Sequence, residues 1–431
     1  MEWIVQAPLK TSGVLRLPQV VALYTGAVLG SGILILPGLA AELSGPASLI
    51  AWGLMAILVV PMALTMGLLS AKYPDAGGVS FFVTKAFNPQ IGSLIGWFFL
   101  LSVVVGAPVL ALTGAGYVCA AVGLGDIFRL LIAIAILSAG ILLNYIGMKM
   151  TSQVQVAVVL TTIIVIIVTI IGSFTAIEPS NFTPFMPYGW ESVGHASAVL
   201  FWCFIGWEAI SHISGEFLDP QRDAIRGTLI AAAIISILYF LTAFVVVGTH
   251  SYGPALSDVS LIHIIKTSFG SSGATVAGVA ALFICMAPAI AYIGAASRLA
   301  CSLASNGFAP HFLARRSEKY HTPFGGLLVL SGCFAILLLV FSTRIVSLST
   351  LIQIPSGTFI ITYIGGCAAG IVLLKNSRFG VIISIISLIL TSSIFLFVGW
   401  AVVYPLVITI FWCAFMGITR KLRGSISVRS S

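Results

Sequence analysis

The sequence predicts an all-α integral membrane protein with about twelve transmembrane helices. Hydrophobic residues make up 59% of the 431 residues, and charged residues make up only 7%. A soluble domain carries about 25% charged residues, so a chain this apolar cannot cover its surface with polar groups. We therefore expect lipid to surround much of it. The spans must be helical, because open strands would leave backbone groups unpaired in lipid.

Apolar runs long enough to cross a bilayer follow one another along the whole chain. A spanning helix needs roughly 20 mostly apolar residues, and the first run is too long for the apolar core of a cleavable signal peptide. Twelve candidates meet this length: 17–43, 47–71, 92–122, 127–146, 150–173, 194–217, 225–249, 273–302, 324–342, 347–373, 380–399 and 402–419. The last two nearly touch, which leaves open eleven spans plus a re-entrant piece.

Basic residues predict the orientation of these spans. Cytoplasmic loops carry an excess of Lys and Arg, and with the N-terminus in the cytoplasm only Arg129, Lys266 and Arg344 fall outside. We expect a multi-pass protein of the plasma membrane, the inner membrane in a bacterium, with both termini in the cytoplasm. The basic tail 420–431 is expected to bind anionic membrane lipid. Because the charges are otherwise scattered, the net charge of +8 does not indicate a nucleic-acid partner.

Cysteine and histidine patterns give no sign of a metal site or of an enzyme. The seven cysteines form no Cys-x-x-Cys pair, and their odd number argues against a disulfide framework. The six histidines are dispersed, and no span holds paired carboxylates. We expect no metal, no cofactor and no catalytic residues.

The first span is rich in glycine at a depth where a helix is normally continuous. Gly26, Gly30 and Gly32 lie within seven residues and are followed by Pro37. Each glycine weakens a helix by roughly 1 kcal/mol relative to alanine, so this stretch can unwind. The alternative is that the small residues only let neighbouring helices approach closely.

The sixth span contains Gly206 between tryptophans, followed by Glu208. A charged side chain at the bilayer centre costs roughly 2.5–3.5 kcal/mol on insertion scales. Glu208 should therefore face protein or a wet cavity, or be protonated. The alternative is a neutral Glu208 that only hydrogen-bonds between helices.

These two unusual spans are five spans apart, as in transporters built from inverted repeats. Such transporters place discontinuous helices at corresponding positions, with the substrate between them. A broken helix offers amide groups to a carboxylate at the start of its second half, and carbonyls to an ammonium at the end of its first half. The α-amino acids and their close relatives carry both groups.

Several motifs, in order, resemble those of the amino acid–polyamine–organocation transporter superfamily. They are Gly30-Ser31-Gly32-Ile33, Tyr73-Pro74-Asp75-Ala76-Gly77-Gly78, Phe204-Ile205-Gly206-Trp207-Glu208, Glu216 to Arg222, Ser297-Arg298, Asn306-Gly307 and Thr322-Pro323. The resemblance implies ten core helices in two inverted halves, with discontinuous helices one and six, plus two peripheral helices. The expected parts are a cytoplasmic N-terminus 1–16, repeats 17–173 and 194–373, peripheral helices 380–419 and the tail.

The resemblance also implies a substrate site at the two breaks. The backbone around Gly30, with the amides of Ser31 and Gly32, would hold the substrate carboxylate. The carbonyls of Val28, Trp202 and Ile205, beside Gly206, would hold its ammonium. Trp202 and Phe204 are candidate gate residues, and Tyr292 is a candidate pocket wall.

The coupling ion is left open by a departure from the family. Some members carry a lysine in helix five that replaces a sodium ion, but none lies between Thr151 and Ile171. Sodium held by Ser297 and Thr162, near Thr161, is one alternative, and proton coupling through Glu208 is our preferred hypothesis. His212 lies four residues later on the same helix face, where it would either relay protons or bond to a loop.

Apart from Glu208, no charged residue lies clearly at mid-depth, so we expect a neutral apolar substrate such as leucine, isoleucine, valine or methionine. The overall pattern is similar to bacterial neutral amino-acid exporters of the superfamily, those for methionine and branched-chain substrates. Alternatives are an uptake permease or exchanger for other amino acids or amines, and a non-transporting nutrient sensor. A monomer or a homodimer is expected.

Overall fold

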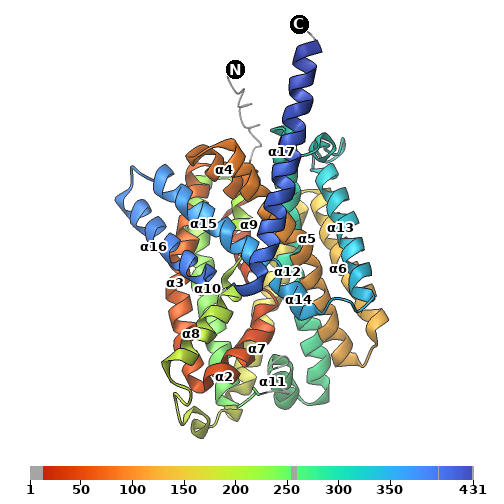
Figure 1. Ribbon diagram of the computed structural model, residues 1–431. Helices are drawn as coiled ribbons and strands as arrows, with labels where there is room; N and C mark the ends of the chain where they lie inside the picture. The colour runs from red at the N-terminus through yellow and green to blue at the C-terminus, as the bar shows by residue number, and fades with distance from the viewer. Residues whose placement is uncertain (1–12, 254–259, 397, 430–431) are drawn as a thin grey trace.

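The structure is a computed structural model that describes residues 13–253, 260–396 and 398–429 (Figure 1). Within these ranges it is nearly all helix. The helices are α1 (Leu17–Val28), α2 (Gly32–Ser44), α3 (Ser48–Lys72), α4 (Gly78–Ala86), α5 (Pro89–Val122), α6 (Asp126–Ile146), α7 (Met148–Ser173), α8 (Gly189–Leu200), α9 (Trp207–Ser211), α10 (Pro220–Gly248), α11 (Ser260–Phe269), α12 (Ser271–Ser305), α13 (Phe324–Ser342), α14 (Leu348–Gln353), α15 (Ser356–Leu373), α16 (Arg378–Phe395) and α17 (Val403–Arg429). The all-α membrane fold predicted from composition is confirmed.

Eleven helical stretches of the described chain are long and apolar enough to cross a membrane. One of them, Gly32–Lys72, contains α2 and α3 joined by a short 3-10 turn, and α1 is a shorter apolar helix before it. If α1 and α2 together form one crossing, the count becomes the predicted twelve. In the region of the expected re-entrant piece, α16 ends at Phe395 and α17 begins at Val403.

Capping residues explain why two helices begin earlier in the sequence than predicted. α5 begins at Pro89 and α10 at Pro220, ahead of the predicted starts at 92 and 225. The side chains of Asn88 and Asp219 accept hydrogen bonds from backbone amides of the first turn. Proline at the first helical position favours the same start, so a search for apolar residues alone misses these polar first turns.

The C-terminal helix is longer than its apolar part. The predicted span ended at 419, but α17 continues to Arg429 and extends past the end of the bundle (Figure 1). A helix satisfies its own backbone groups in water as well as in lipid, so hydropathy does not mark its end. The structure does not describe the side chains of the basic tail 420–431, and it does not describe residues 1–12.

The segment before α1 pairs with the segment after α9. The amides of Val14 and Leu15 donate to the Glu216 carbonyl at 2.9 and 3.0 Å, and the Leu218 amide donates to the Leu15 carbonyl at 2.8 Å. The Glu216 side chain lies 3.6 Å from the Arg298 guanidinium of α12. These contacts tie the start of the first span to the end of the sixth span, and the end of the sixth span to α12.

Two spans are broken near their middle, as the glycine pattern predicted. α1 and α2 are separated by Leu29, Gly30 and Ser31, while α8 passes through a 3-10 turn, Phe201–Phe204, before α9 begins at Trp207. α1 packs against α9, and α2 packs against α8. The two broken helices therefore run past each other in opposite directions with their breaks together.

Gly206 makes this crossing possible. Its φ is +140°, a conformation that L side chains rarely adopt, and a Cβ there would lie 2.7 Å from the Ala27 carbonyl oxygen. Gly32 is similarly close to Cys203, since its Cβ would lie 2.5 Å from the Cys203 sulfur. Both breaks therefore depend on missing side chains. Gly32 combines the two interpretations given for the first-span glycines, since it packs closely against Cys203 and directly follows the break.

We predict that Gly206→Ala destabilises the protein by about 2 kcal/mol or more, because it combines backbone strain with a clash against α1. Thermal unfolding of the detergent-purified protein measures this as a lower melting temperature. Gly194→Ala is the matched control, since nothing lies within 4 Å of a Cβ at that position, and it should change stability by at most about 1 kcal/mol. Equal melting temperatures for the two variants would contradict the role assigned to Gly206.

Candidate functional site

The break in the first span leaves amide groups at the start of α2. Ser31 precedes α2, and its side chain makes no capping hydrogen bond. In the part of the chain that the structure describes, the amides of Ser31 and Gly32 donate to no protein acceptor, and both residues are buried. Such amides carry the positive end of the helix dipole and favour a negatively charged group, as predicted for the substrate carboxylate.

The break in the sixth span leaves carbonyl groups at the end of the 3-10 turn. Ile205 is extended, with φ −79° and ψ 143°, and Gly206 turns the chain into α9. No backbone or side-chain donor among the described residues reaches the carbonyl of Trp202 or of Ile205. These oxygens are the ones expected to hold an ammonium group.

One phenol joins the two breaks. Tyr239 of α10 is fully buried, and its hydroxyl oxygen lies 2.9 Å from the Val28 carbonyl oxygen and 3.0 Å from the Cys203 carbonyl oxygen. A hydroxyl carries a single proton, so the two carbonyls share one donor. The Val28 carbonyl, a predicted ammonium ligand, thus has a protein partner and retains one free lone pair.

Glu208 lies at the other side of the break in the sixth span. It is completely buried, and no cation of the described chain lies within ion-pair distance. The Tyr292 hydroxyl donates to its Oε1 at 2.9 Å, and the Gly206 amide donates to its Oε2 at 3.0 Å. The contact with Tyr292 joins α9 to α12 and connects the predicted pocket wall to the predicted coupling residue.

Tyr363 of α15 completes the start of α9. Its hydroxyl oxygen accepts hydrogen bonds from the amides of Gly206 and Trp207, each at 3.0 Å. With Glu208, it satisfies the first amides of α9. The two broken helices therefore differ: α9 is capped by the protein, and α2 is not. A substrate carboxylate would find free donors at α2.

Aromatic rings of Phe99, Trp202, Tyr292 and Phe359 form a cluster next to these groups. Phe359 of α15 lies 5.5 Å from Tyr292, 6.2 Å from Phe99 and 6.4 Å from Trp202, measured between ring centroids. Phe204, the other predicted gate residue, packs against Trp52 and Tyr239 instead, at 6.1 and 5.2 Å. Trp202 thus joins this aromatic cluster, and Phe204 is part of the core. Their gate roles stay predictions.

His212 contacts the loop between α3 and α4. Its Nδ1 lies 3.3 Å from the Ala76 carbonyl oxygen, and its ring packs at a tilt against Phe99, 4.4 Å away between centroids. In that loop, burial raises the pKa of the Asp75 carboxyl, and a 2.7 Å hydrogen bond from the Gly77 amide opposes the rise. The loop contact is the alternative foreseen for His212, and a relay with Glu208 stays a prediction.

The hydroxyls of Thr161, Thr162 and Ser297, the candidates near a sodium site, differ in burial and in hydrogen bonding. Thr161 bonds to the Ala157 carbonyl of its own helix on an outward face. Thr162 and Ser297 are both fully buried, and the Ser297 hydroxyl donates to the Gly294 carbonyl at 3.0 Å. Sodium coupling through Thr162 and Ser297 stays an alternative hypothesis. Among the described residues, no group of three or more His, Cys, Asp or Glu side chains gathers as metal ligands do.

Sequence reasoning missed Tyr239, Tyr363, Phe99 and Phe359. A signal for the two tyrosines was available, because a phenol within an apolar span needs a hydrogen-bond partner. Neither the partner carbonyls nor the aromatic neighbours can be found without the packing of α10 and α15 against the breaks. The phenylalanines carry no such signal.

The match with known proteins agrees with this geometry. The family model described as amino acid permease matches residues 15–419. The chain belongs to the amino acid permease family. This membership confirms the predicted resemblance, and it confirms that the protein is of a transporter class rather than an enzyme class.

This permease is similar to two bacterial proteins over nearly its whole length. It is 36% identical to the amino acid permease YecA of Bacillus subtilis, over 90% of this chain and 91% of YecA. It is 32% identical to the L-methionine/branched-chain amino acid exporter YjeH of Escherichia coli, over 91% of this chain and 93% of the exporter. The permease also shares its fold with MhsT, whose crystal structure contains L-phenylalanine. That match has a TM-score of 0.66 at 14% identity and covers 91% of this chain and 99% of MhsT.

We predict that Tyr239→Phe lowers substrate affinity by about tenfold, because two carbonyls at the breaks lose their shared donor. Equilibrium binding to the purified permease measures this. The matched control is Tyr404→Phe, which removes a 3.0 Å hydrogen bond from a tyrosine hydroxyl to the Leu101 carbonyl, on α17 and away from the breaks. Affinity that falls equally in both variants would mean that Tyr239 has no special link to the site.

Proposed function

We propose that this permease is a secondary transporter of small neutral amino acids, either branched-chain or sulfur-containing, that works by alternating access. The observation that carries the proposal is the pairing of free groups at the two breaks. The start of α2 offers unpaired amides at Ser31 and Gly32, and the neighbouring turn offers unpaired carbonyls at Trp202 and Ile205. A carboxylate and an ammonium on one carbon satisfy both.

The surroundings favour an uncharged apolar side chain. Trp202, Tyr292 and Phe359 form the adjacent wall, and Glu208, the carboxylate at the site, is occupied by Tyr292 and Gly206. A cationic side chain would need a further anion, because an unpaired charge in a buried site is strongly disfavoured. The name of the Escherichia coli relative points to the same substrates.

The lack of a cationic partner near Glu208 supports proton coupling through this residue. A buried carboxylate without a cationic partner is costly when ionised, so its protonation can change with the state of the breaks. Its Oε2 contacts the Gly206 amide at the hinge of the sixth span, and its Oε1 contacts Tyr292 of α12. Movement of either helix would change the cost of ionising Glu208, and that links proton binding to conformation. His212 would pass protons toward the loop that contains Ala76.

We propose that transport in the cell is outward, across the plasma membrane, with both termini in the cytoplasm. The positive-inside distribution of Lys and Arg supports this orientation, and the similarity to an exporter supports the direction. An uptake permease or exchanger would use the same site. A sensor would bind the same ligands without moving them.

The substrate prediction is tested by counterflow in proteoliposomes with labelled amino acids. Leucine, isoleucine, valine or methionine inside the vesicles should drive accumulation of labelled leucine at least about tenfold above that with lysine or glutamate inside, since burying an unpaired charge is disfavoured. Binding of these amino acids without counterflow would favour a sensor. Stimulation by none of the amino acids would overturn the proposed substrate class.

The coupling prediction concerns Glu208→Gln, which keeps the size of the side chain but cannot ionise. Proton-driven accumulation should be lost, while exchange of substrate for substrate, measured across pH, should continue with little pH dependence. Glu178→Gln, at an exposed carboxylate in the loop before α8, is the matched control and should keep the full response to a pH gradient. A normal response to the gradient in Glu208→Gln would exclude this residue as the coupling group.

A further inference from the structure

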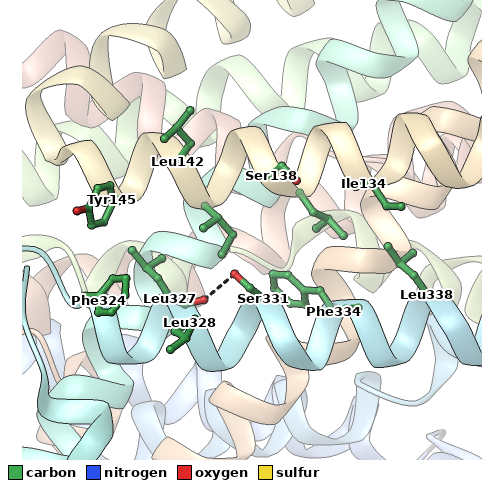
Figure 2. A pocket seen from close by; sticks show the side chains of 13 residues that line it. Ile134, Ser138, Leu142, Tyr145, Phe324, Leu327, Leu328, Ser331, Phe334 and Leu338 are labelled. Carbon is green, nitrogen blue, oxygen red and sulfur yellow. Dashed lines mark hydrogen bonds between the residues drawn. The ribbon is translucent and has the colours of Figure 1, made fainter.

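A groove runs along the outer surface of the bundle between α6 and α13, away from the breaks. Its volume is about 420 Å³, and Figure 2 shows the two helices side by side, with Leu327, Ser331 and Phe334 of α13 facing α6. Small side chains create the hollow, notably Ser138 on α6 and Ser331 and Ala335 on α13. The Ser331 hydroxyl donates to the Leu327 carbonyl of its own helix at 2.9 Å. With this hydroxyl satisfied, the wall around it presents mainly hydrocarbon.

The length of the groove matches one leaflet of a bilayer. Its lining extends on α6 from Ile134 to Tyr145 and on α13 from Phe324 to Leu338, eleven and fourteen residues apart, or about 17 and 21 Å at 1.5 Å per residue. The hydrocarbon core of a bilayer is about 30 Å thick, so one leaflet is about 15 Å. A single acyl chain fits this length.

The Tyr145 end of the groove meets the loop between α12 and α13. The Tyr145 ring lies 5.4 Å from the ring of Tyr320 and 6.0 Å from that of Phe324, between centroids. The Ser317 hydroxyl reaches the Tyr145 hydroxyl at 3.5 Å, and the Thr322 hydroxyl donates to the Tyr145 carbonyl at 2.8 Å. This loop therefore marks the end of the groove at the membrane surface.

The loop supplies net positive charge at that end, because Arg315, Arg316 and Lys319 outnumber the neighbouring acidic residue Glu318. Arg315, Arg316 and Lys319 are exposed, and Lys319 Nζ lies 5.0 Å from the centre of the Tyr320 ring. Lys149, at the start of α7 just after Tyr145, is exposed as well. None of the ion pairs formed by the described residues uses any of these four cations. An apolar groove with unpaired cations at its surface end is complementary to an anionic lipid.

We propose that this groove is a binding site for an anionic phospholipid. One acyl chain lies between α6 and α13, and the phosphate and headgroup lie on Arg315, Arg316 and Lys319. Arginine suits this role because its planar guanidinium binds phosphate oxygens through two hydrogen bonds. The site is independent of the amino-acid site at the breaks, so neither proposal rests on the other.

Native mass spectrometry of the full-length protein in detergent tests this, with phosphatidylglycerol and phosphatidylcholine of identical acyl chains. One phosphatidylglycerol should be retained at concentrations where phosphatidylcholine is lost, with an advantage of about fivefold per cation. The combined variant Arg315→Gln, Arg316→Gln, Lys319→Gln should reduce phosphatidylglycerol to the level of phosphatidylcholine. Lys375→Gln with Arg378→Gln, in the loop after α15 and at the first residue of α16, is the matched control and should retain the preference.

A second variant tests the groove itself. Ser331→Phe fills the hollow and should abolish the retained phosphatidylglycerol, while Ser393→Phe, on the exposed face of α16, should not. Equal retention of the two lipids by the unchanged protein, or unchanged retention in Ser331→Phe, would overturn the proposal. A shift from dimer to monomer in Ser331→Phe with lipid retention unaltered would also overturn it, by showing a contact between copies. If Ser331→Phe does not fold, the loop variant decides alone.

Discussion

The structure depends on one constraint, which is that lipid offers no hydrogen-bond partner to an exposed peptide group. A break within a spanning helix must therefore be satisfied from inside the protein or by a ligand. Two breaks occur here, and they lie together because α1 packs on α9 and α2 on α8. Gly206 allows this approach, since any side chain there would meet the Ala27 carbonyl. The crossing brings the exposed peptide groups of both spans into one small volume.

Some of these peptide groups have hydrogen-bond partners within the protein and others do not, and this difference defines the candidate site. Tyr363 and Glu208 take the amides at the start of α9, and Tyr239 takes carbonyls from both breaks. The amides of Ser31 and Gly32 and the carbonyls of Trp202 and Ile205 remain for a ligand among the described contacts. A zwitterion whose two charges lie close together would satisfy these remaining amides and carbonyls. The substrate would thus complete the hydrogen bonding that the helices lack.

Much of this arrangement was predictable from the sequence, because the relevant signals are local. Apolar length predicted the spans, the glycines predicted the breaks, and a lone carboxylate at Glu208 marked the sixth span. The starts of α5 and α10 were missed because Asn88 and Asp219 are polar caps outside the apolar runs. Tyr239, Tyr363 and Phe359 were missed because their roles arise from contacts between distant spans. Phe204 and Trp202 belong to the same turn and were predicted to play the same role. Only the packing shows that Trp202 contacts Phe359 while Phe204 packs into the core.

The central claim is that the free amides of α2 and the free carbonyls of the neighbouring turn each hold one end of an amino acid. Isothermal titration of the purified permease tests it with leucine, with isoamylamine, which lacks the carboxylate, and with 4-methylpentanoate, which lacks the ammonium. Leucine should bind about a hundredfold or more tightly than either analogue, because each missing group removes charge-assisted hydrogen bonds and leaves buried polar groups unpaired. An analogue that binds as tightly as leucine would contradict the account.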